Sequence, residues 1–190
     1  ETLSAPGDKL VVCEGELDCV IDFGNHYLTR FEKERDDELP RAPLRLARCT
    51  LCGLLQLNEV VDPDLVYRKY WYRSGINQTM QRALLNLVRD GTAWHTSGTW
   101  VDIGANDGTL LRFVPKTFTR IAYEPALNFE TELKGSADKV VADYFRADPS
   151  LRDIQVITSA AMFYDLDKPD EFVEGIVEAL APDGIWINQL

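Results

Sequence analysis

The chain has 190 residues, of which 45% are hydrophobic and 27% are charged, a composition typical of a globular protein with a core of its own. Its formal net charge of −11 disfavours binding to the phosphate backbone of nucleic acids, so a small-molecule substrate is the better expectation. No apolar run approaches the roughly 20 residues of a membrane-spanning helix, and no secretory signal opens the chain, so we expect a cytoplasmic protein that does not bind membranes. Because the first residue is Glu1, we expect the sequence to begin inside a longer polypeptide.

The cysteines all lie near the N-terminus, at Cys13, Cys19, Cys49 and Cys52. A cluster of thiols in a cytoplasmic protein is more typical of a metal site than of disulfides, and all four are candidate zinc ligands. Cys49 and Cys52 have the C-x-x-C spacing that directs two thiolates at one ion. Cys13 and Cys19 are more widely separated than is usual, so His26 is an alternative to one of them. Four protein ligands make the zinc structural; the competing interpretation is a set of unliganded thiols.

Residues 1–60 are predicted to form this zinc-binding module, a small β-rich unit with little core. Its candidate strands are Leu10–Val12, Val20–Phe23 and Leu54–Leu57, with a charged, turn-prone stretch at Glu32–Arg41. Residues 61–98 predict a helical linker of two helices. Asp62-Pro63 is typical of a helix start, and apolar residues then recur at helical spacing, at Met80, Leu84, Leu87 and Val88.

Residues 99–190 alternate apolar strands with helical segments, which is typical of a parallel sheet with crossover helices in a Rossmann-like α/β domain. The predicted strands are Trp100–Ile103, Arg120–Glu124, Lys139–Ala142, Ile154–Ser159 and Gly184–Leu190. The predicted helices are Thr109–Val114, Leu127–Lys134 and Pro169–Leu180. The final strands of such a domain are absent, so we expect the outer edge of the sheet to be covered by a further region of the protein or by a second copy.

The loop after the first of these strands is the strongest functional signal. It runs Asp102-Ile103-Gly104-Ala105-Asn106-Asp107-Gly108, with glycines where the backbone must turn sharply and approach a ligand. A dinucleotide fingerprint that begins at Gly104 would have glycine at positions 106 and 109 as well. The chain has Asn106 and Thr109 there, which argues against NAD or FAD. Acidic residues at Asp102 and Asp107 would repel a pyrophosphate but suit the sulfonium and amino groups of S-adenosylmethionine.

Two further strands end in acidic residues. Glu124 follows Gly104 by about 20 residues, the spacing expected of a carboxylate that accepts both ribose hydroxyls. Asp143 ends the next strand, where it could accept the adenine amino group while Tyr144 or Phe145 covers the ring. Three strand ends thus predict one nucleoside site, whereas the alternative is a set of ordinary turn residues. The candidate cofactor contacts are Tyr72, Ser74, Asn77, Asp102, Gly104, Asn106, Gly108, Glu124, Pro125, Asp143, Tyr144 and Phe145.

Several sequence blocks occur together in a specific order. They are Val20–Gly24, Cys49–Leu57, Tyr70-Trp71-Tyr72-Arg73-Ser74-Gly75-Ile76-Asn77, Val101–Leu111, and Thr158–Leu166 leading into Ala181-Pro182-Asp183-Gly184. In this order the chain resembles the zinc-containing sugar C-methyltransferases, which act on nucleotide-linked 4-keto-deoxysugars. The resemblance implies a class I methyltransferase fold. It also implies removal of the acidic proton beside a ketone, giving an enolate that attacks the methyl group of S-adenosylmethionine.

The resemblance also bears on individual residues. Tyr72, Ser74 and Asn77 would line the cofactor and substrate cleft, with ordinary helix packing as the alternative. The family's general base, a histidine of its C-terminal region, would lie beyond Leu190, so no catalytic residue is assigned within the chain. The family opens with a C-x-x-C pair whose first position is Leu10 here, so one zinc ligand that the family has is either absent or replaced by Cys19 or His26.

Three functions therefore compete. The first is a methyltransferase whose chemistry is completed beyond Leu190 or by another chain. The second is a non-catalytic module of the same fold that serves binding or assembly within a larger protein. The third keeps the enzyme but changes the acceptor to an oxygen or nitrogen atom of a small molecule.

Overall fold

The computed structural model describes residues 4–6, 13, 15–28 and 39–190, and the chain divides into two compact units between Trp71 and Tyr72. The segment expected as a helical linker is therefore shared between the units. The predicted strand at Leu10–Val12, and most of the predicted turn at Glu32–Arg41, lie outside the described residues. None of the helices in these described ranges is long and apolar enough to cross a membrane.

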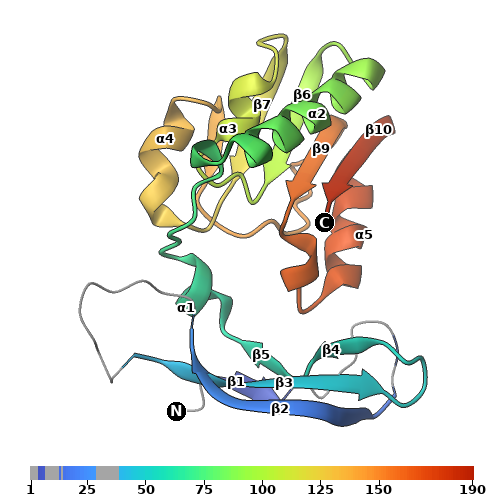
Figure 1. Ribbon diagram of the computed structural model, residues 1–190. Coiled ribbons are helices and arrows are strands. Elements are labelled where there is room, and N and C mark those ends of the chain that lie inside the picture. The colour runs from blue at the N-terminus through green and yellow to red at the C-terminus, as the bar shows by residue number, and fades with distance from the viewer. Residues whose placement is uncertain (1–3, 7–12, 14, 29–38) are drawn as a thin grey trace. The chain divides into compact units, whose positions relative to one another are not determined.

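The first unit is built mainly from antiparallel strands (Figure 1). One sheet has the order β2-β3-β4, with β2 at Leu17–Tyr27, β3 at Arg41–Cys49 and β4 at Leu55–Leu57. A second pairs β1 (Ser4–Pro6) with β5 (Glu59–Val61). Helix α1 (Pro63–Tyr67) begins after Asp62, whose carboxylate accepts the Asp64 N–H. Burial is concentrated on β3, at Ala42, Ala47 and Cys49, so this module has the small core that its composition predicts.

The second unit confirms the predicted α/β fold class. Its five-stranded sheet has the order β10-β9-β6-β7-β8, and every neighbouring pair is parallel. The strands are β6 (Gly98–Ile103), β7 (Phe118–Tyr123), β8 (Lys139–Val141), β9 (Ile154–Ala160) and β10 (Leu180–Gln189). The chain moves from β6 outward through β7 to β8, then returns to the other side of β6 for β9 and β10. The strand order therefore reverses between β6 and β9, and ligands of such sheets bind outside the carboxyl ends of the strands near this switch point.

Helices cover both faces of this sheet (Figure 1). Helix α2 (Gln78–Trp94) packs against the face that carries Trp100, and its backbone at Gly91 approaches the indole so closely that a Cβ there would overlap the ring. Helix α5 (Pro169–Ala179) packs against the opposite face, where Phe172 and Ile176 join the strand residues in one buried cluster. Burying each such side chain contributes about 1.5–3 kcal/mol.

The remaining connections are short. Helix α3 (Thr109–Phe113) follows β6, and a turn of 3-10 helix, η2 (Leu127–Phe129), leads into α4 (Glu130–Lys134) after β7. The 3-10 turns η1 (Ser74–Ile76) and η3 (Phe163–Asp165) precede α2 and follow β9. Strand β10 begins at Leu180, earlier than the sequence predicts, and its register against β9 is irregular between Leu180 and Ile185.

Candidate cofactor site and cysteine cluster

The loop between β6 and α3 is fastened to the end of the neighbouring strand. The N–H groups of Gly104 and Ala105 both donate to the Tyr123 carbonyl, at 2.9 and 3.1 Å. Three loop residues have left-handed backbone: Gly104 at φ 71°, Asn106 at φ 51° and Gly108 at φ 74°. At Gly108 a side chain would also collide with Ser136. The glycine pattern is therefore a backbone requirement of the loop.

Glu124 stands directly after β7 and bonds to two backbone segments. Its Oε2 accepts the Asn106 N–H at 2.6 Å and its Oε1 accepts the Ala126 N–H at 2.8 Å. The side chain is buried, and burial raises the pKa of Glu124 although these two N–H groups oppose the shift. Because a carboxylate oxygen has two lone pairs, both oxygens can still accept a ligand hydroxyl.

Asp102 is a second buried acid, on the neighbouring strand β6. The Thr158 hydroxyl donates to its Oδ1 at 2.7 Å, and the Trp100 indole N–H donates to that same hydroxyl at 3.1 Å. Burial raises the pKa of Asp102 to about 7, the charge of Glu124 adds to the shift, and the Thr158 hydrogen bond opposes it. The sequence pattern does not assign Thr158 to the site, although a hydroxyl inside a buried apolar strand is a usable signal.

Asp102 and Glu124 lack a basic partner within the described ranges, since no ion pair there includes either of them. Buried carboxylates are costly unless they are paired with a cation or hydrogen-bonded. A ligand with positive charge and hydroxyl groups matches this pair of acids chemically. This is the fit expected of S-adenosylmethionine, which carries a sulfonium, an ammonium and a ribose diol.

The segment just before α2 is tied to the same loop. The Asn106 Oδ1 accepts the Ser74 N–H at 3.0 Å, and its Nδ2 donates to the Tyr72 carbonyl at 3.0 Å. The Asp107 Oδ2 accepts the Gly75 N–H at 2.9 Å. Tyr72 and Ser74, predicted on the resemblance to line the cleft, are thus brought beside the loop. Their backbones, rather than their side chains, make these contacts.

Other predicted contacts have local roles in the structure. The Asn77 side chain caps α2 by accepting the N–H groups of Thr79 and Met80. Asp143 accepts the Tyr144 N–H at 2.9 Å just after β8. The ring of Phe145 lies in the core, edge-on to Tyr123 with ring centroids 5.3 Å apart. Tyr144 is therefore the half-buried aromatic residue at this strand end, and the half-buried Pro125 follows Glu124.

Three of the four predicted zinc ligands come together in the first unit. The sulfur atoms of Cys13, Cys49 and Cys52 all lie within 4.8 Å of one another, and the Cys13 and Cys49 sulfurs are 3.4 Å apart. Ligand sulfurs around tetrahedral zinc are about 3.8 Å apart, given a Zn–S bond of about 2.3 Å. The group therefore fits a zinc ion, with three ligands from the part of the chain that the structure describes.

Cys49 is the buried member of the group. Burial opposes its ionisation, but the N–H groups of Cys52 and Leu51 donate to its sulfur, and together with the neighbouring thiols they lower the pKa of Cys49 to about 7. The thiolate is the form that binds metal, so this environment favours coordination near neutral pH.

Cys19 and His26 are not part of the group. Cys19 is exposed on β2 and pairs with Ala47, two residues before Cys49, which corresponds to about 7 Å along an extended strand. The exposed His26 lies farther along β2, where its Nε2 is hydrogen-bonded to the Phe23 carbonyl at 2.9 Å.

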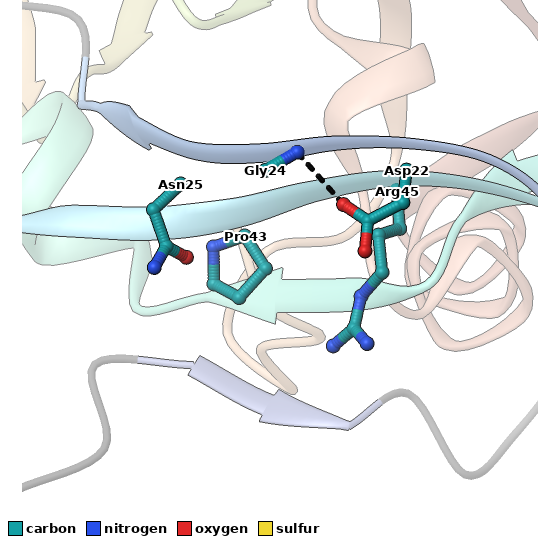
Figure 2. A pocket seen from close by; sticks show the side chains of 5 residues that line it. All are labelled: Asp22, Gly24, Asn25, Pro43 and Arg45. Carbon is teal, nitrogen blue, oxygen red and sulfur yellow. Dashed lines mark hydrogen bonds between the residues drawn. The ribbon is translucent and has the colours of Figure 1, made fainter.

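The first unit has a shallow hollow of about 220 Å³. Figure 2 shows the residues that line it, Asp22, Gly24, Asn25, Pro43 and Arg45. The Gly24 N–H donates to the Asp22 carboxylate at 2.7 Å, closing a turn within β2. The Arg45 guanidinium forms an ion pair with the buried Glu59 of β5. The charged groups of the hollow thus serve local structure, and we assign it no ligand.

Comparison with known proteins bears on both units. Residues 11–67 match the model of a methyltransferase-associated family described as "Putative zinc binding domain". Among solved structures, the plantazolicin methyltransferase BpumL in complex with SAH is similar, with a TM-score of 0.52 and 12% identity, over 60% of this chain and 49% of that one. A SAM-dependent methyltransferase from Leishmania major gives a TM-score of 0.50 and 18% identity, over 60% of this chain and 52% of that one.

The second unit has the fold of SAM-dependent methyltransferases. The chain spans about half the length of the solved structures that it matches. No curated protein sequence matches the chain.

Proposed function

We propose that the second unit binds S-adenosylmethionine at the carboxyl ends of β6 and β7, and that the protein transfers the methyl group of this cofactor to a small molecule. The observation that carries the proposal is the pair of buried carboxylates, Asp102 and Glu124, at adjacent strand ends without a basic partner among the described residues. S-adenosylmethionine supplies an electrophilic methyl group on a positively charged sulfur.

Each protein group has a distinct task in this proposal. Glu124 accepts hydroxyl groups of the ribose while it holds the loop at Asn106. Asp102 compensates the positive charge of the methionine end, an interaction that is strong because the carboxylate is shielded from water. Asp143 accepts a hydrogen bond from the adenine amino group, and Tyr144 covers the adenine ring.

Calorimetric titration of the chain with S-adenosylmethionine at pH 8 tests the cofactor site. Asp102→Asn removes the charge but keeps an oxygen that can accept from Thr158, and we expect it to weaken binding at least tenfold. Asp90→Asn is the matched control, because Asp90 is exposed on α2, and it should bind like the wild type. Absence of binding to the wild type, or equal affinity of the two variants, would refute the proposal.

For the acceptor, we propose a nucleotide-linked keto-deoxysugar that is methylated on the carbon beside its ketone. The order of the sequence blocks and the cysteine group in the N-terminal unit support this subclass. The test is incubation of the full-length protein with S-adenosylmethionine and candidate keto-sugars, followed by NMR of the product. A new carbon–methyl bond is expected. An oxygen- or nitrogen-bound methyl group would change the acceptor class, and cofactor binding without any turnover would favour a non-catalytic module.

We also propose that Cys13, Cys49 and Cys52 bind a zinc ion. Metal analysis of the purified protein should find one zinc per chain, and Cys49→Ser should lose it. Cys19→Ser is the matched control, since Cys19 lies outside the group, and it should retain the metal. A zinc-free wild type, or equal loss in both variants, would contradict the assignment.

A further inference from the structure

Residues 72–76, which we call the strap, lie against the loop between β6 and α3 and are held by its side chains. The Asn106 carboxamide bonds to two strap residues at once, accepting from the Ser74 N–H and donating to the Tyr72 carbonyl, both at 3.0 Å. It therefore acts as a neighbouring strand would, since it pairs with the carbonyl and the N–H on either side of the extended residue Arg73. Asp107 adds a third bond, from the Gly75 N–H to its Oδ2.

The strap also contacts residues outside the loop. Arg73 forms an ion pair with Glu132 of α4 at 2.6 Å, and its guanidinium lies 5.0 Å from the centroid of the Phe129 ring. The Gln81 side chain of α2 donates to the Gly75 carbonyl at 2.5 Å. A Cβ on Gly75 would lie 2.8 Å from the Asp107 Oδ2, so the strap fits closely against the loop.

These contacts occupy Asn106 and Asp107, two of the three loop side chains that the sequence assigns to the ligand. The oxygen and the nitrogen of the Asn106 carboxamide both bond to the strap, and the backbone N–H of Asn106 donates to Glu124. One Asp107 oxygen accepts the N–H and hydroxyl of Thr109, and the other accepts Gly75. In contrast, the half-buried Ser74 hydroxyl has no hydrogen-bond partner in the part of the chain that the structure describes.

We propose that Asn106 and Asp107 are positioning residues, which hold the strap against the loop so that Ser74 completes the ligand site. This inference rests on the proposed cofactor site and goes beyond it, because it places a continuous series of hydrogen bonds between Glu124, Asn106 and Ser74. A ligand that bonds to Glu124 and to Ser74 restrains both ends of this series. Ligand affinity and strap order are therefore linked.

Hydrogen exchange tests the strap directly, without ligand. Asn106→Gly removes the carboxamide and tolerates the left-handed backbone of this residue, at φ 51°. We expect the Ser74 amide to exchange at least tenfold faster than in the wild type. Asn106→Asp keeps an oxygen acceptor and should restore slow exchange at Ser74. Equal exchange in the wild type and in Asn106→Gly would overturn the inference.

Titration with S-adenosylmethionine tests the linkage. Asn106→Gly and Ser74→Ala should each weaken binding about tenfold, and the double variant should be no weaker than either single one. Glu132→Gln releases the strap without touching the loop and should also weaken binding. If the loss of affinity in the double variant equals the product of the losses in Asn106→Gly and Ser74→Ala, Asn106 contacts the ligand directly. If the wild type does not bind the cofactor, the proposed function fails, while the exchange experiment still decides whether Asn106 holds the strap.

Discussion

Asp102→Asn should make the unliganded protein more stable at neutral and alkaline pH. Asp102 is buried, and the described residues give it the Thr158 hydroxyl but no basic group. Asparagine has nearly the same shape, cannot ionise, and keeps an oxygen that can accept from Thr158. The substitution therefore removes the cost of burying the charge while it preserves the hydrogen bond.

The magnitude follows from the pKa of Asp102, which burial raises from 3.8 to about 7. The folded protein binds this proton more tightly than the unfolded chain does. The resulting stability is fully present below pH 3.8, is lost as the pH rises, and is absent above about pH 7. One pKa unit corresponds to about 1.4 kcal/mol, so the whole difference is about 4 kcal/mol, of which about 2–3 kcal/mol falls between pH 5 and pH 8.

Urea unfolding at pH 5 and pH 8 measures this difference. The free energy of unfolding of Asp102→Asn minus that of the wild type should increase by about 2–3 kcal/mol between the two pH values. The exposed Asp90→Asn variant should show no such increase. A difference that does not change with pH, or that falls as the pH rises, would refute the assignment of a buried and unpaired carboxylate.

Two further substitutions test the packing of the second unit. Gly108→Ala should lower the free energy of unfolding by about 1–3 kcal/mol, because the residue has φ 74° and its Cβ would collide with Ser136; a Tm equal to that of the wild type would contradict the loop geometry. Phe172→Ala should cost about 3–5 kcal/mol in urea unfolding. Val177→Ala, on the exposed side of the same helix, should stay within about 0.5 kcal/mol of the wild type, and equal losses would mean that α5 buries a different face.

The fold of the second unit could be predicted well because each of its strands is indicated by the residues of that strand alone. Short apolar runs rich in β-branched or aromatic residues, such as Trp100–Ile103 and Ile154–Ser159, indicate strands, and their alternation with helices indicates a parallel sheet. The sequence predicts the start of β10 too late, because Ala181-Pro182-Asp183-Gly184 has the composition of a turn. In the structure this stretch belongs to an edge strand with irregular register, where proline is tolerated.

Contacts between distant segments could not be predicted. Nothing in the sequence around Asn106 indicates that its side chain bonds to Tyr72 and Ser74, because such pairing depends on how α2 returns to the sheet. The membership of the zinc group also depends on contacts between distant segments. Spacing identified Cys49 and Cys52, but only the register of β2 against β3 separates Cys19 from them.

Glu124 illustrates why strand-end acids are difficult to interpret from sequence or from a single variant. Its position predicts a ribose contact, whereas the structure gives its carboxylate two backbone N–H donors from different segments. An amide at this position would turn an N–H donor toward one of those two donors, so Glu124→Gln should disturb the loop as well as any ligand. Weaker binding by that variant would not distinguish the two causes. Asp102→Asn does distinguish them, because it is expected to stabilise the unliganded fold while it weakens cofactor binding, and a structural defect alone cannot produce that combination.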